Sequence, residues 1–561
     1  MARGISIGNQ DFQAIIENQY FYVDKTSFIK EWWDGGDMVT LITRPRRFGK
    51  TLTIDMVEKF FSVNYAGRSD LFEGLSVWKE EKYQKLQGTC PVISLSFANA
   101  KETDYSHARE KIIQLIAGVY ARHEFLLESN CLTAGEKEIF RRKTVDMGDV
   151  DAALSLNQLS EYLCRYYGKK VIILLDEYDT PLQEAYVHGY WEEMVSFTRG
   201  IFNAAFKTNP YLERAFLTGI TRVSKESIFS DLNNLEVVTT TSEKYETALG
   251  FTQQEVTEAL KEYGLAEREE EVKEWYDGFT FGNTHDIYNP WSIINYLDKQ
   301  RLAAYWANTS SNSLVGKLIQ EGIPEVKMVM EDLLQGKSFH ASFDEQIVFS
   351  QLDHNLHAIW SLLLACGYLK VETYSVDGNY GECDYTLSLT NKEVRLMFRH
   401  MIDGWFADYT PAYNAFIKAL LQDDKKAMNV YMNQTALATF SSFDTGNKPS
   451  ETTDPERFYH GFVLGLIVDL VDRYRITSNR ESGFGRYDVV LEPFRDGDPA
   501  FVLEFKVHDS EEEETLADTV AAALRQIEEK AYDTELTARG ISRERIRHYG
   551  FAFVGKTVLI G

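Results

Sequence analysis

The sequence predicts an α/β protein with a parallel sheet near the N-terminus, a mostly helical middle region and a second α/β domain at the C-terminus. Aliphatic runs alternate with helical patterns up to about residue 240, which favours a parallel sheet covered by helices. Helical patterns dominate residues 301–440, and two strand patterns followed by a helix return after a polar, turn-rich stretch at 444–455. These observations indicate several domains, since 561 residues exceed what one core usually holds.

The overall composition excludes several classes of protein. A formal net charge of −26 excludes a protein that coats nucleic acid non-specifically, so any such contact needs a local basic patch. Five cysteines without a Cys-x-x-Cys pair argue against a disulfide scaffold or a zinc ribbon, and they fit a reducing compartment. The N-terminus lacks the apolar core of a signal peptide, and no run of about 18 apolar residues occurs. We therefore expect a cytoplasmic protein without membrane contact.

The first strand and helix enclose the most informative loop. Apolar residues 38–42 predict a buried strand, and the apolar spacing of 52–61 predicts a helix. Between them residues 44–51 read RPRRFGKT. Strand, tight loop, Gly-Lys-Thr and helix is the layout of a P-loop, although Arg44 stands where that motif has its first glycine. The motif alone therefore predicts a degenerate P-loop.

A P-loop binds the phosphates of ATP at the N-terminus of its helix, where backbone N–H groups and the helix dipole favour an anion. The residues expected at ATP are Arg47, Phe48, Gly49, Lys50 and Thr51. Lys50 would reach the β- and γ-phosphates, and the Thr51 hydroxyl would hold Mg²⁺. The alternative is an ordinary helix start with a basic residue in its first turn.

Two carboxylates after a second aliphatic run favour the nucleotide site. Residues 171–175 are consecutive aliphatics, which predicts a strand buried inside a parallel sheet, and Asp176 and Glu177 follow at its C-terminal end, where α/β sheets bind ligands. Asp176 would complete the Mg²⁺ ligands, and Glu177 would orient or deprotonate the attacking water. The alternative is a strand that ends in a solvated acidic turn.

Further elements of this region follow from the same patterns. Strands are expected at 91–97 and 215–220, and helices at 107–120 and 158–167. Thr218 or Arg222 could sense the γ-phosphate, although most such residues are ordinary polar groups at a strand end.

Residues 241–300 are expected to form a helical lid over the nucleotide. Helical patterns at 252–263 and 267–275 support this, and Thr252 with Glu255 has the spacing of a capping box. Farther on, Pro290 with Ser292 suggests the capped start of another helix.

The middle region contains a helix followed by a hairpin pattern. The helix 359–366 ends at Gly367, and strand patterns at 368–373 and 385–389 flank a turn at 377–379. This is the profile of a winged-helix module, which could bind nucleic acid or could be a packing element.

The C-terminal region places two carboxylates opposite each other. A helix is expected at 456–474, and strands at 487–492 and 500–507. A hairpin centred near residue 496 would pair Asp488 with Glu504, with their Cβ atoms about 5 Å apart.

Lys506 would project from the same face as Glu504, because side chains alternate along a strand. A divalent metal between the acids would remove their repulsion, the Phe505 carbonyl could add an oxygen ligand, and Lys506 could activate the water that attacks a phosphodiester. The alternative is an outward-facing strand with a Glu504–Lys506 salt bridge. Gln526, on a helix expected at 515–532, could face the metal or belong to a plain amphipathic helix.

The sequence also resembles a known bacterial and archaeal family that joins an AAA-ATPase-like P-loop domain to a C-terminal nuclease-like domain of the PD-(D/E)xK superfamily. The resemblance covers nearly the whole chain, and RPRRFGKT is its most specific part. It also rests on YVDKT (22–26), LLDEYD (174–179), YNPWS (288–292), YHGF (459–462), NRESGFGRYD (479–488) and EFK (504–506).

The resemblance implies the normal P-loop of that family despite Arg44, with ATP and Mg²⁺ as cofactors and Mn²⁺ as an alternative at the nuclease site. Together, the patterns and the resemblance predict an AAA-like domain at 1–240, a helical lid at 241–300, a mostly helical, winged-helix-like middle region at 301–440 and a nuclease-like α/β domain at 451–561, of which the first and last are what the resemblance implies. The resemblance also implies that the first helix of the nuclease core supplies a Glu. Glu456 is the preferred candidate, and Glu481 is the second. Tyr487 stands where the name of the superfamily has a proline.

The leading hypothesis is an ATP-binding and ATP-hydrolysing protein coupled to a metal-dependent nuclease, with DNA preferred to RNA as the partner. Roles in mobile elements or phage defence are suspected for relatives. One alternative is an ATP-controlled assembly switch whose C-terminal domain binds nucleic acid without cleaving it. Another is an ATPase motor, in which Arg222 would act across the subunits of a homo-oligomeric ring.

Overall fold

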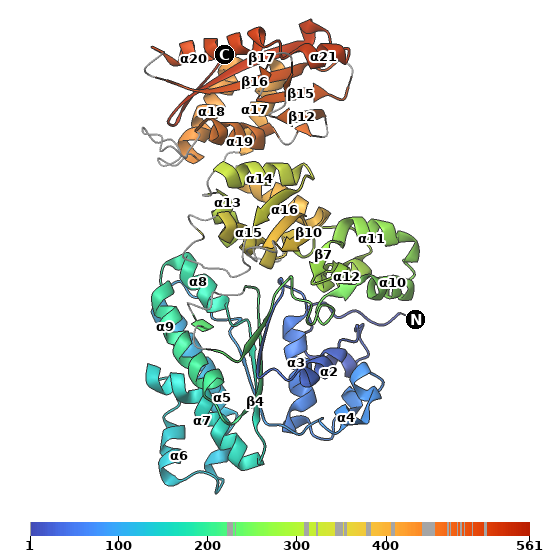
Figure 1. Ribbon diagram of the computed structural model, residues 1–561, viewed down its shortest axis with the longest axis vertical. Coiled ribbons are helices and arrows are strands. Elements are labelled where there is room, and N and C mark those ends of the chain that lie inside the picture. The colour runs from blue at the N-terminus through green and yellow to red at the C-terminus, as the bar shows by residue number, and fades with distance from the viewer. Residues whose placement is uncertain are drawn as a thin grey trace. The chain divides into compact units, whose positions relative to one another are not determined.

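The structure is a computed structural model, shown in Figure 1. It describes residues 2–221, 228–229, 232–307, 313–320, 324–342, 352, 356–376, 383–405, 410–439, 455–467, 470–471, 473–478, 481–482, 485–486, 488–495, 497–509 and 513–561. The chain divides into two compact units, which are Met1–Leu318 with Ser338–Met397 and Ile319–Lys337 with Phe398–Gly561. Among the described helices none is long and apolar enough to cross a bilayer.

The first unit is built on a five-stranded sheet in which every pair of neighbours is parallel. Its strand order is β2 (Val92–Ser96), β3 (Val171–Asp176), β4 (Leu212–Gly219), β1 (Val39–Thr43) and β5 (Leu235–Val238). The four predicted strands are confirmed within a few residues. The short edge strand β5 was not predicted, because only four residues form it and many of the residues that flank it in the sequence are polar.

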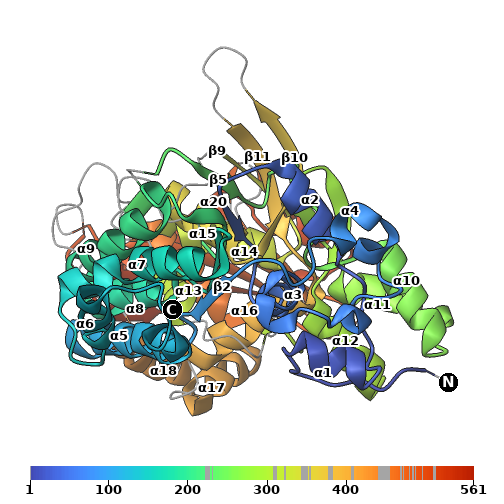
Figure 2. The ribbon, with the colours of Figure 1, turned by 90° about the horizontal axis from the view of Figure 1, so that it is seen from below.

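Helices cover both faces of this sheet because its strands are aliphatic on both sides. Ile173 and Leu175 point into one core, whereas Ile172 and Leu174 point into the other. Figures 1 and 2 show α5, α7 and α9 on one side and α2 and α3 on the other. The helices of this part are α1 (Phe12–Glu17), α2 (Ser27–Gly35), α3 (Lys50–Phe61), α4 (Glu81–Gln84), α5 (Tyr105–Ala121), α6 (Ala134–Arg141), α7 (Asp149–Tyr167), α8 (Thr180–His188) and α9 (Trp191–Phe202).

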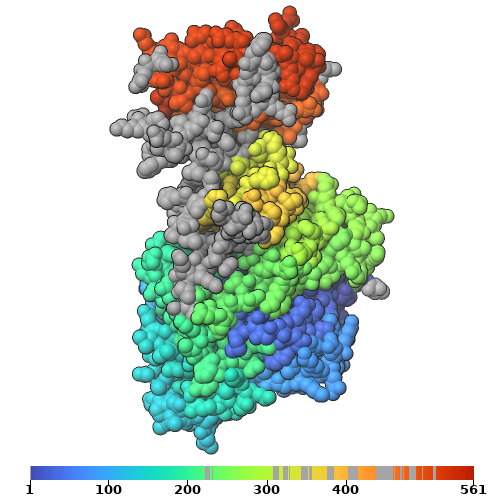
Figure 3. Space-filling model, in the orientation of Figure 1, coloured from blue at the N-terminus to red at the C-terminus, as the bar shows by residue number. Residues whose placement is uncertain are grey.

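The segment expected as a helical lid contains helices and also a small antiparallel sheet. Its elements are β6 (Phe251–Thr252), α10 (Gln253–Glu262), α11 (Glu269–Tyr276), β7 (Phe279–Phe281), β8 (Thr284–Tyr288) and α12 (Pro290–Lys299). We call residues 251–299 the lid. Figure 3 shows it, in light green, lying against the blue surface of the N-terminal residues.

The two predicted helix starts in the lid have different outcomes. The capping box is confirmed, because Thr252 N donates to Glu255 Oε2 (2.8 Å) and Glu255 N donates to Thr252 Oγ1 (3.3 Å). The expected cap at α12 is wrong in detail. Asn289 caps this helix through Trp291 N (2.9 Å), because Pro290 occupies the first helical position, where its missing N–H costs nothing.

The predicted helix and hairpin of the middle region are present. They are α15 (Leu356–Ala365), β10 (Leu369–Val376) and β11 (Cys383–Leu389), and β9 (Phe339–Ser342) adds a third strand beside β11. Helices α13 (Ser313–Gln320) and α16 (Lys392–Trp405) flank them in sequence. The expected turn at 377–379 lies outside the described residues.

The second unit contains a mixed sheet in the order β12 (Tyr474–Ser478), β15 (Val489–Pro493), β16 (Ala500–Val507), β17 (Ile546–Val554) and β18 (Thr557–Ile560), in which only β16 and β17 are parallel neighbours. Strands β13 (Glu481–Ser482) and β14 (Gly485–Arg486) form a separate pair. Its helices are α14 (Pro324–Leu334), α17 (Thr410–Gln422), α18 (Lys425–Thr439), α19 (Pro455–Ile467), α20 (Leu516–Glu529) and α21 (Thr534–Ala538). The two α/β regions confirm the predicted fold class.

The predicted alternation along β16 is confirmed. Leu503 and Phe505 belong to a core that includes Val463 of α19, whereas Val502 packs in another core with Ile527 of α20. The predicted helix at 456–474 is too long. It ends at Ile467, and Tyr474 already begins β12, since an apolar run cannot by itself distinguish a helix from a buried strand. The stretch 444–454 lies outside the described residues.

Candidate functional site

The loop between β1 and α3 turns sharply before the helix begins. Gly49 precedes the first residue of α3 with φ 85°, and Arg47 has φ 66°. Both lie in the left-handed region, which costs a non-glycine residue about 1 kcal/mol or more. Because α3 starts at Lys50, its N-terminus lies at the C-terminal edge of the parallel sheet, where anions and metals bind in such folds.

Lys50 is buried and folded onto its own loop. Its Nζ donates to the carbonyl oxygens of Arg44 (2.8 Å) and Pro45 (2.7 Å). Burial lowers the pKa of Lys50, and the negative charges of Glu177 and Asp176 oppose that effect. An incoming phosphate would therefore replace two neutral carbonyl acceptors with charged ones.

Asp176 connects the loop helix to a neighbouring strand. Its Oδ2 accepts a hydrogen bond from Thr51 Oγ1 (2.7 Å), and its Oδ1 accepts one from Thr218 Oγ1 (2.6 Å). Burial raises the pKa of Asp176, and these two hydroxyl donors counteract the rise. The structure therefore brings Thr51, Asp176 and Thr218 together.

Glu177 follows with φ 51°, so the chain turns immediately after the strand. Its backbone N–H lies 3.4 Å from Thr218 Oγ1, and its side chain accepts a hydrogen bond from Thr180 Oγ1 (3.1 Å). Glu177 lines the same cavity as Lys50 and Thr51. Arg222 lies outside the described residues.

Asp179 is a buried acid to which the sequence assigned no separate role. Its Oδ2 accepts hydrogen bonds from the backbone N–H groups of Ile220 (3.0 Å) and Thr221 (2.8 Å) and from the Thr221 hydroxyl (2.8 Å). Burial raises the pKa of Asp179, and these donors oppose the rise. Asp179 therefore fixes the backbone that follows β4, and its signal was the third acid of the string Asp176–Asp179.

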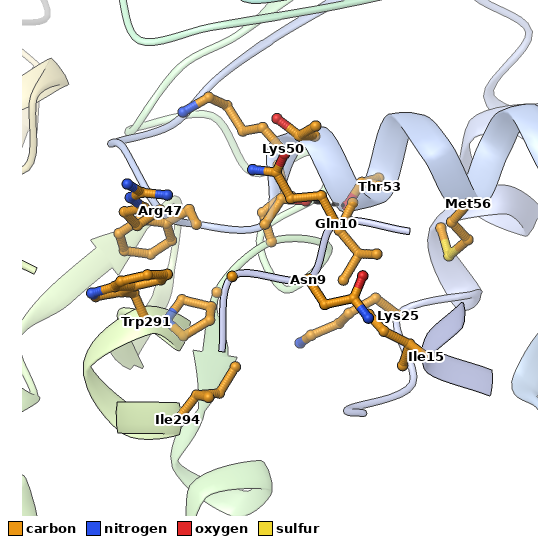
Figure 4. A pocket seen from close by; sticks show the side chains of 18 of the residues that line it. Asn9, Gln10, Ile15, Lys25, Arg47, Lys50, Thr53, Met56, Trp291 and Ile294 are labelled. Atoms are coloured by element: carbon orange, nitrogen blue, oxygen red, sulfur yellow. Dashed lines mark hydrogen bonds between the residues drawn. The ribbon is translucent and has the colours of Figure 1, made fainter. Parts of the chain in front are cut away.

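The side chains that precede the Gly-Lys-Thr step contact the lid. The Arg47 guanidinium lies 4.4 Å from the centre of the Trp291 ring, as Figure 4 shows. Phe48 is buried edge-on against Phe279 and Phe281, with ring centres 4.8 and 5.5 Å apart. Arg47 and Phe48 were expected at ATP; both line the cavity that also contains Lys50, and their side chains contact the lid.

Arg44, which replaces the first glycine of the motif, is fully buried. It donates to the carbonyl oxygens of Thr43 (2.9 Å) and Thr239 (2.8 Å), and its guanidinium lies 4.2 Å from the centre of the Phe281 ring. Arg44 thus joins the loop, the end of β5 and the lid, which gives a structural reason for an arginine at this position.

A cavity of about 660 Å³ opens beside the N-terminus of α3. Its walls include the loop with Lys50 and Thr51, the N-terminal segment at Asn9 and the lid at Trp291 (Figure 4). The sequence indicated the loop and a lid over the nucleotide, but not the wall at Asn9, because that segment lies far from the loop along the chain.

The second unit brings the two predicted C-terminal acids to adjacent strands. Val489 pairs with Leu503, so the next positions outward are Asp488 and Glu504. The Phe505 N–H donates to Asp488 Oδ2 (2.8 Å), which ties the end of one strand to the other. Glu504 is 2% exposed, whereas Asp488 is half-buried.

Gln526 of α20 reaches one of these acids, Glu504. Its Nε2 donates to Glu504 Oε1 and lies 3.3 Å from the Tyr532 hydroxyl. Lys506 is half-buried and two residues beyond Glu504, on the α20 side of β16. The Phe505 side chain packs in the core on the opposite face.

The remaining predicted acids cannot be placed as side chains. Glu456 lies on α19 and Glu481 on β13, but their side chains lie outside what the structure describes. Within the described ranges, no group of three or more His, Cys, Asp or Glu side chains is arranged to hold a metal ion.

Comparisons with known proteins match the two regions of the chain that contain these residues. Residues 6–229 match the family model described as "Predicted AAA-ATPase", and residues 454–561 match that of the "PD-(D/E)XK nuclease superfamily". A protein of Azotobacter chroococcum mcd 1, described as "Uncharacterized protein in vnfD 5'region", is 27% identical over 319 residues. That match spans 56% of this chain and 56% of that protein, so the chain covers about half the length of this relative. The chain thus carries a predicted AAA-ATPase-like domain near its N-terminus and a PD-(D/E)XK nuclease superfamily domain at its C-terminus.

Proposed function

We propose that the protein binds and hydrolyses ATP and that this activity controls a metal-dependent nuclease, with DNA as the favoured substrate. Support for the ATP half comes from the hydrogen-bonded group of Thr51, Asp176 and Thr218 beside Lys50. Support for the nuclease half comes from the adjacent acids Asp488 and Glu504. The first group of residues lies in the domain that matches an AAA-ATPase family, and the acids lie in the domain that matches a nuclease superfamily. These two matches are the observation on which the proposal depends.

At the nucleotide site, each residue has a role that follows from its position. Backbone N–H groups at the start of α3 would bind the phosphates, and Lys50 would exchange its two carbonyl acceptors for phosphate oxygens. Glu177, half-buried on the cavity wall, would orient the attacking water. Thr218 would hold Asp176 in place rather than contact the γ-phosphate, since its hydroxyl already donates to that carboxylate.

Mg²⁺ fits the oxygen atoms of Thr51 and Asp176, because hard cations prefer hydroxyl and carboxylate ligands. The direct hydrogen bond between them would open to share the cation. When bound, the ion would neutralise the charge that develops on the phosphates.

The nuclease site also offers oxygen ligands that suit Mg²⁺ or Mn²⁺. Asp488 and Glu504 would hold the ion, and the Phe505 carbonyl could contribute a further oxygen. Gln526 would hold one oxygen of the Glu504 carboxylate, and this would orient the other oxygen toward the ion. Lys506 would position the water that attacks the phosphodiester, and the bound ion would supply charge stabilisation.

A cleavage assay tests the nuclease half. Wild-type protein is incubated with single- and double-stranded DNA and with RNA in Mg²⁺ or Mn²⁺, beside Asp488→Ala and Lys506→Ala. We expect wild-type cleavage and a loss of at least a hundredfold in both variants, which is the scale of a lost catalytic group. Equal cleavage by all three proteins would reject the assignment. Binding by the wild type without cleavage of any substrate would favour an ATP-controlled assembly switch instead.

A further inference from the structure

We propose that the outer edge of β2 binds an extended peptide of a partner protein as an additional strand. The peptide would place a Lys or Arg beside Glu58 of α3. β2 is the end strand of the five-stranded parallel sheet, so β3 pairs with one side of it and the other side faces outward. Such an open edge is a template for strand addition. The proposal concerns protein binding and is independent of ATP hydrolysis and nucleic-acid cleavage.

The backbone groups that face outward follow from the hydrogen bonds on the paired side of β2. The Phe97 N–H donates to the Asp176 carbonyl oxygen (2.9 Å) toward β3. Because the direction of backbone groups alternates along a strand, those of Val92, Ser94 and Ser96 point away from β3. Within the described residues, none of these three N–H groups donates to another protein group. They are therefore available to a strand that arrives from outside.

The chain itself already makes one contact of this kind on the outer side. Ser62 forms an isolated parallel bridge with Cys90, just before β2, and Val63 N donates to Cys90 O (2.9 Å). Farther along, the exposed Arg122 donates to Ser94 O through its Nη2 (3.0 Å). An added strand would continue beyond Val63 and take the place of the Arg122 guanidinium.

A groove of about 560 Å³ follows this edge. Figure 2 shows β2 between α3 and α5, which form the sides of the groove. Its lining also includes Thr51 and Asp176, at the C-terminal edge of the sheet. The outward groups from Val92 to Ser96 span about 13 Å and repeat every two residues. An extended chain presents donors and acceptors at the same repeat, which favours a peptide over a compact ligand.

The two walls of the groove differ in chemistry. Val92 packs in the core that contains α3, whereas Leu95 packs in the core that contains α5, so successive side chains of an added strand would face the two walls in turn. Asp55 and Glu58 line the α3 wall. The α5 side is lined by Leu115, Phe125, Leu163 and Tyr167, together with Arg122 and His123.

Glu58 supplies the charge that selects the peptide. Asp55 already pairs with Lys59 (2.6 Å), whereas Glu58 forms no ion pair within the described part of the chain. Burial raises the pKa of Glu58, and the Ser94 hydroxyl opposes the rise. A cation beside Glu58 would offset the cost of its burial. The residue opposite Ser94 would face this wall and its two neighbours the other, so the pattern apolar, basic, apolar is expected.

Fluorescence anisotropy with a labelled Ser-Val-Lys-Val-Ser peptide tests the proposal on the full chain, in about 0.15 M salt to screen its overall negative charge. A second peptide carries Glu in place of Lys. Two more are N-methylated, one at both Val residues and the other at Lys, so that only one of them loses the N–H groups that face β2.

The proteins are wild type, Glu58→Gln, Ser94→Pro and the control Ser94→Ala. Ser94→Pro removes an outward N–H and keeps the pairing with β3, which an edge strand tolerates, whereas Ser94→Ala keeps that N–H. We expect Ser94→Ala to match the wild type and Ser94→Pro to lose affinity. The Glu peptide and Glu58→Gln should each weaken binding by about tenfold or more, which is the scale of a hydrogen bond to a charged group.

One N-methylated peptide should bind the wild type and the other should not. No binding of the Lys peptide, equal binding of the Lys and Glu peptides, or equal binding of the two N-methylated peptides would each overturn the proposal. Wild-type dimers that Ser94→Pro abolishes without any peptide would assign the edge to a second copy of the chain and overturn it as well. Because the peptide comparisons use wild-type protein, they decide the matter even if Ser94→Pro does not fold.

Discussion

Gly367, between α15 and β10, provides a sensitive test of how the middle region contacts the P-loop. It has φ 82°, and a Cβ atom placed there would lie 2.6 Å from Pro45 Cγ and 2.8 Å from an edge atom of Phe279. Pro45 also holds Lys50 through its carbonyl oxygen. The substitution Gly367→Ala therefore forces either the loop at Pro45 or the turn between α15 and β10 (the corner) to move.

The expected cost has two parts. A left-handed alanine costs about 1–2 kcal/mol, and pressing a methyl group into packed ring atoms adds about 1–3 kcal/mol. Gly264→Ala is the matched control, because Gly264 has φ 71° and no atom within 4 Å of a built Cβ. The control should lose only the backbone part, about 1–2 kcal/mol.

Urea unfolding followed by tryptophan fluorescence measures the difference, and calorimetry measures ATP affinity. We expect Gly367→Ala to be destabilised by about 2 kcal/mol more than Gly264→Ala, because only it clashes with rigid ring atoms. Only Gly367→Ala should weaken ATP binding, since it displaces the residue that positions Lys50. If the two variants unfold alike and bind ATP alike, the corner does not brace the loop and the reasoning is wrong.

Three further predictions concern single side chains. Glu177→Gln should retain ATP binding and slow hydrolysis by about a hundredfold or more in a phosphate-release assay, and an unchanged rate would remove Glu177 from the reaction. Gln526→Leu should weaken Mn²⁺ binding at the second unit by about tenfold to a hundredfold, read by electron paramagnetic resonance; unaltered binding would mean that Gln526 does not orient Glu504. Burial raises the pKa of Glu393 to about 7, although the Ser292 hydroxyl and the Trp306 N–H donate hydrogen bonds to it. The contribution of protonated Glu393 to the free energy of unfolding is therefore complete below pH 4.5 and is lost as the pH rises through 7. The loss is about 3 kcal/mol at most. Glu393→Gln should flatten the urea midpoint between pH 5 and 8, and an equally steep profile in the variant would contradict that pKa.

Local pattern was sufficient to predict much of the fold. Five consecutive aliphatics predicted β3, since strands buried on both faces of a parallel sheet are typically continuous apolar runs of this short length. The hairpin centre at residue 496 predicted the pairing of β15 with β16, and the observed pair Val489 and Leu503 has that centre. A symmetric hairpin fixes its register from the turn alone, so no distant contact was needed.

Features that depend on distant contacts were not predicted. The cavity wall at Asn9 lies against a loop about 40 residues away and a lid helix that begins at Pro290, and nothing in the local spacing of Asn9 signals this. Arg44 was interpreted as a departure from the motif because its partner, Phe281, lies on a lid strand. That strand was not predicted, since the sequence around it is rich in turn residues. Strand β17 was not predicted, because its parallel pairing with β16 is a contact between segments that are separated in the sequence and leaves no local signal.

The most direct test of an ATP-controlled nuclease measures single-turnover cleavage with and without ATP in wild type, Lys50→Ala and Glu504→Gln. We predict that ATP changes the wild-type rate, that Lys50→Ala cleaves at the ATP-free rate whether or not ATP is present, and that Glu504→Gln does not cleave. Wild-type cleavage by Glu504→Gln, or an ATP response that survives in Lys50→Ala, would contradict the account.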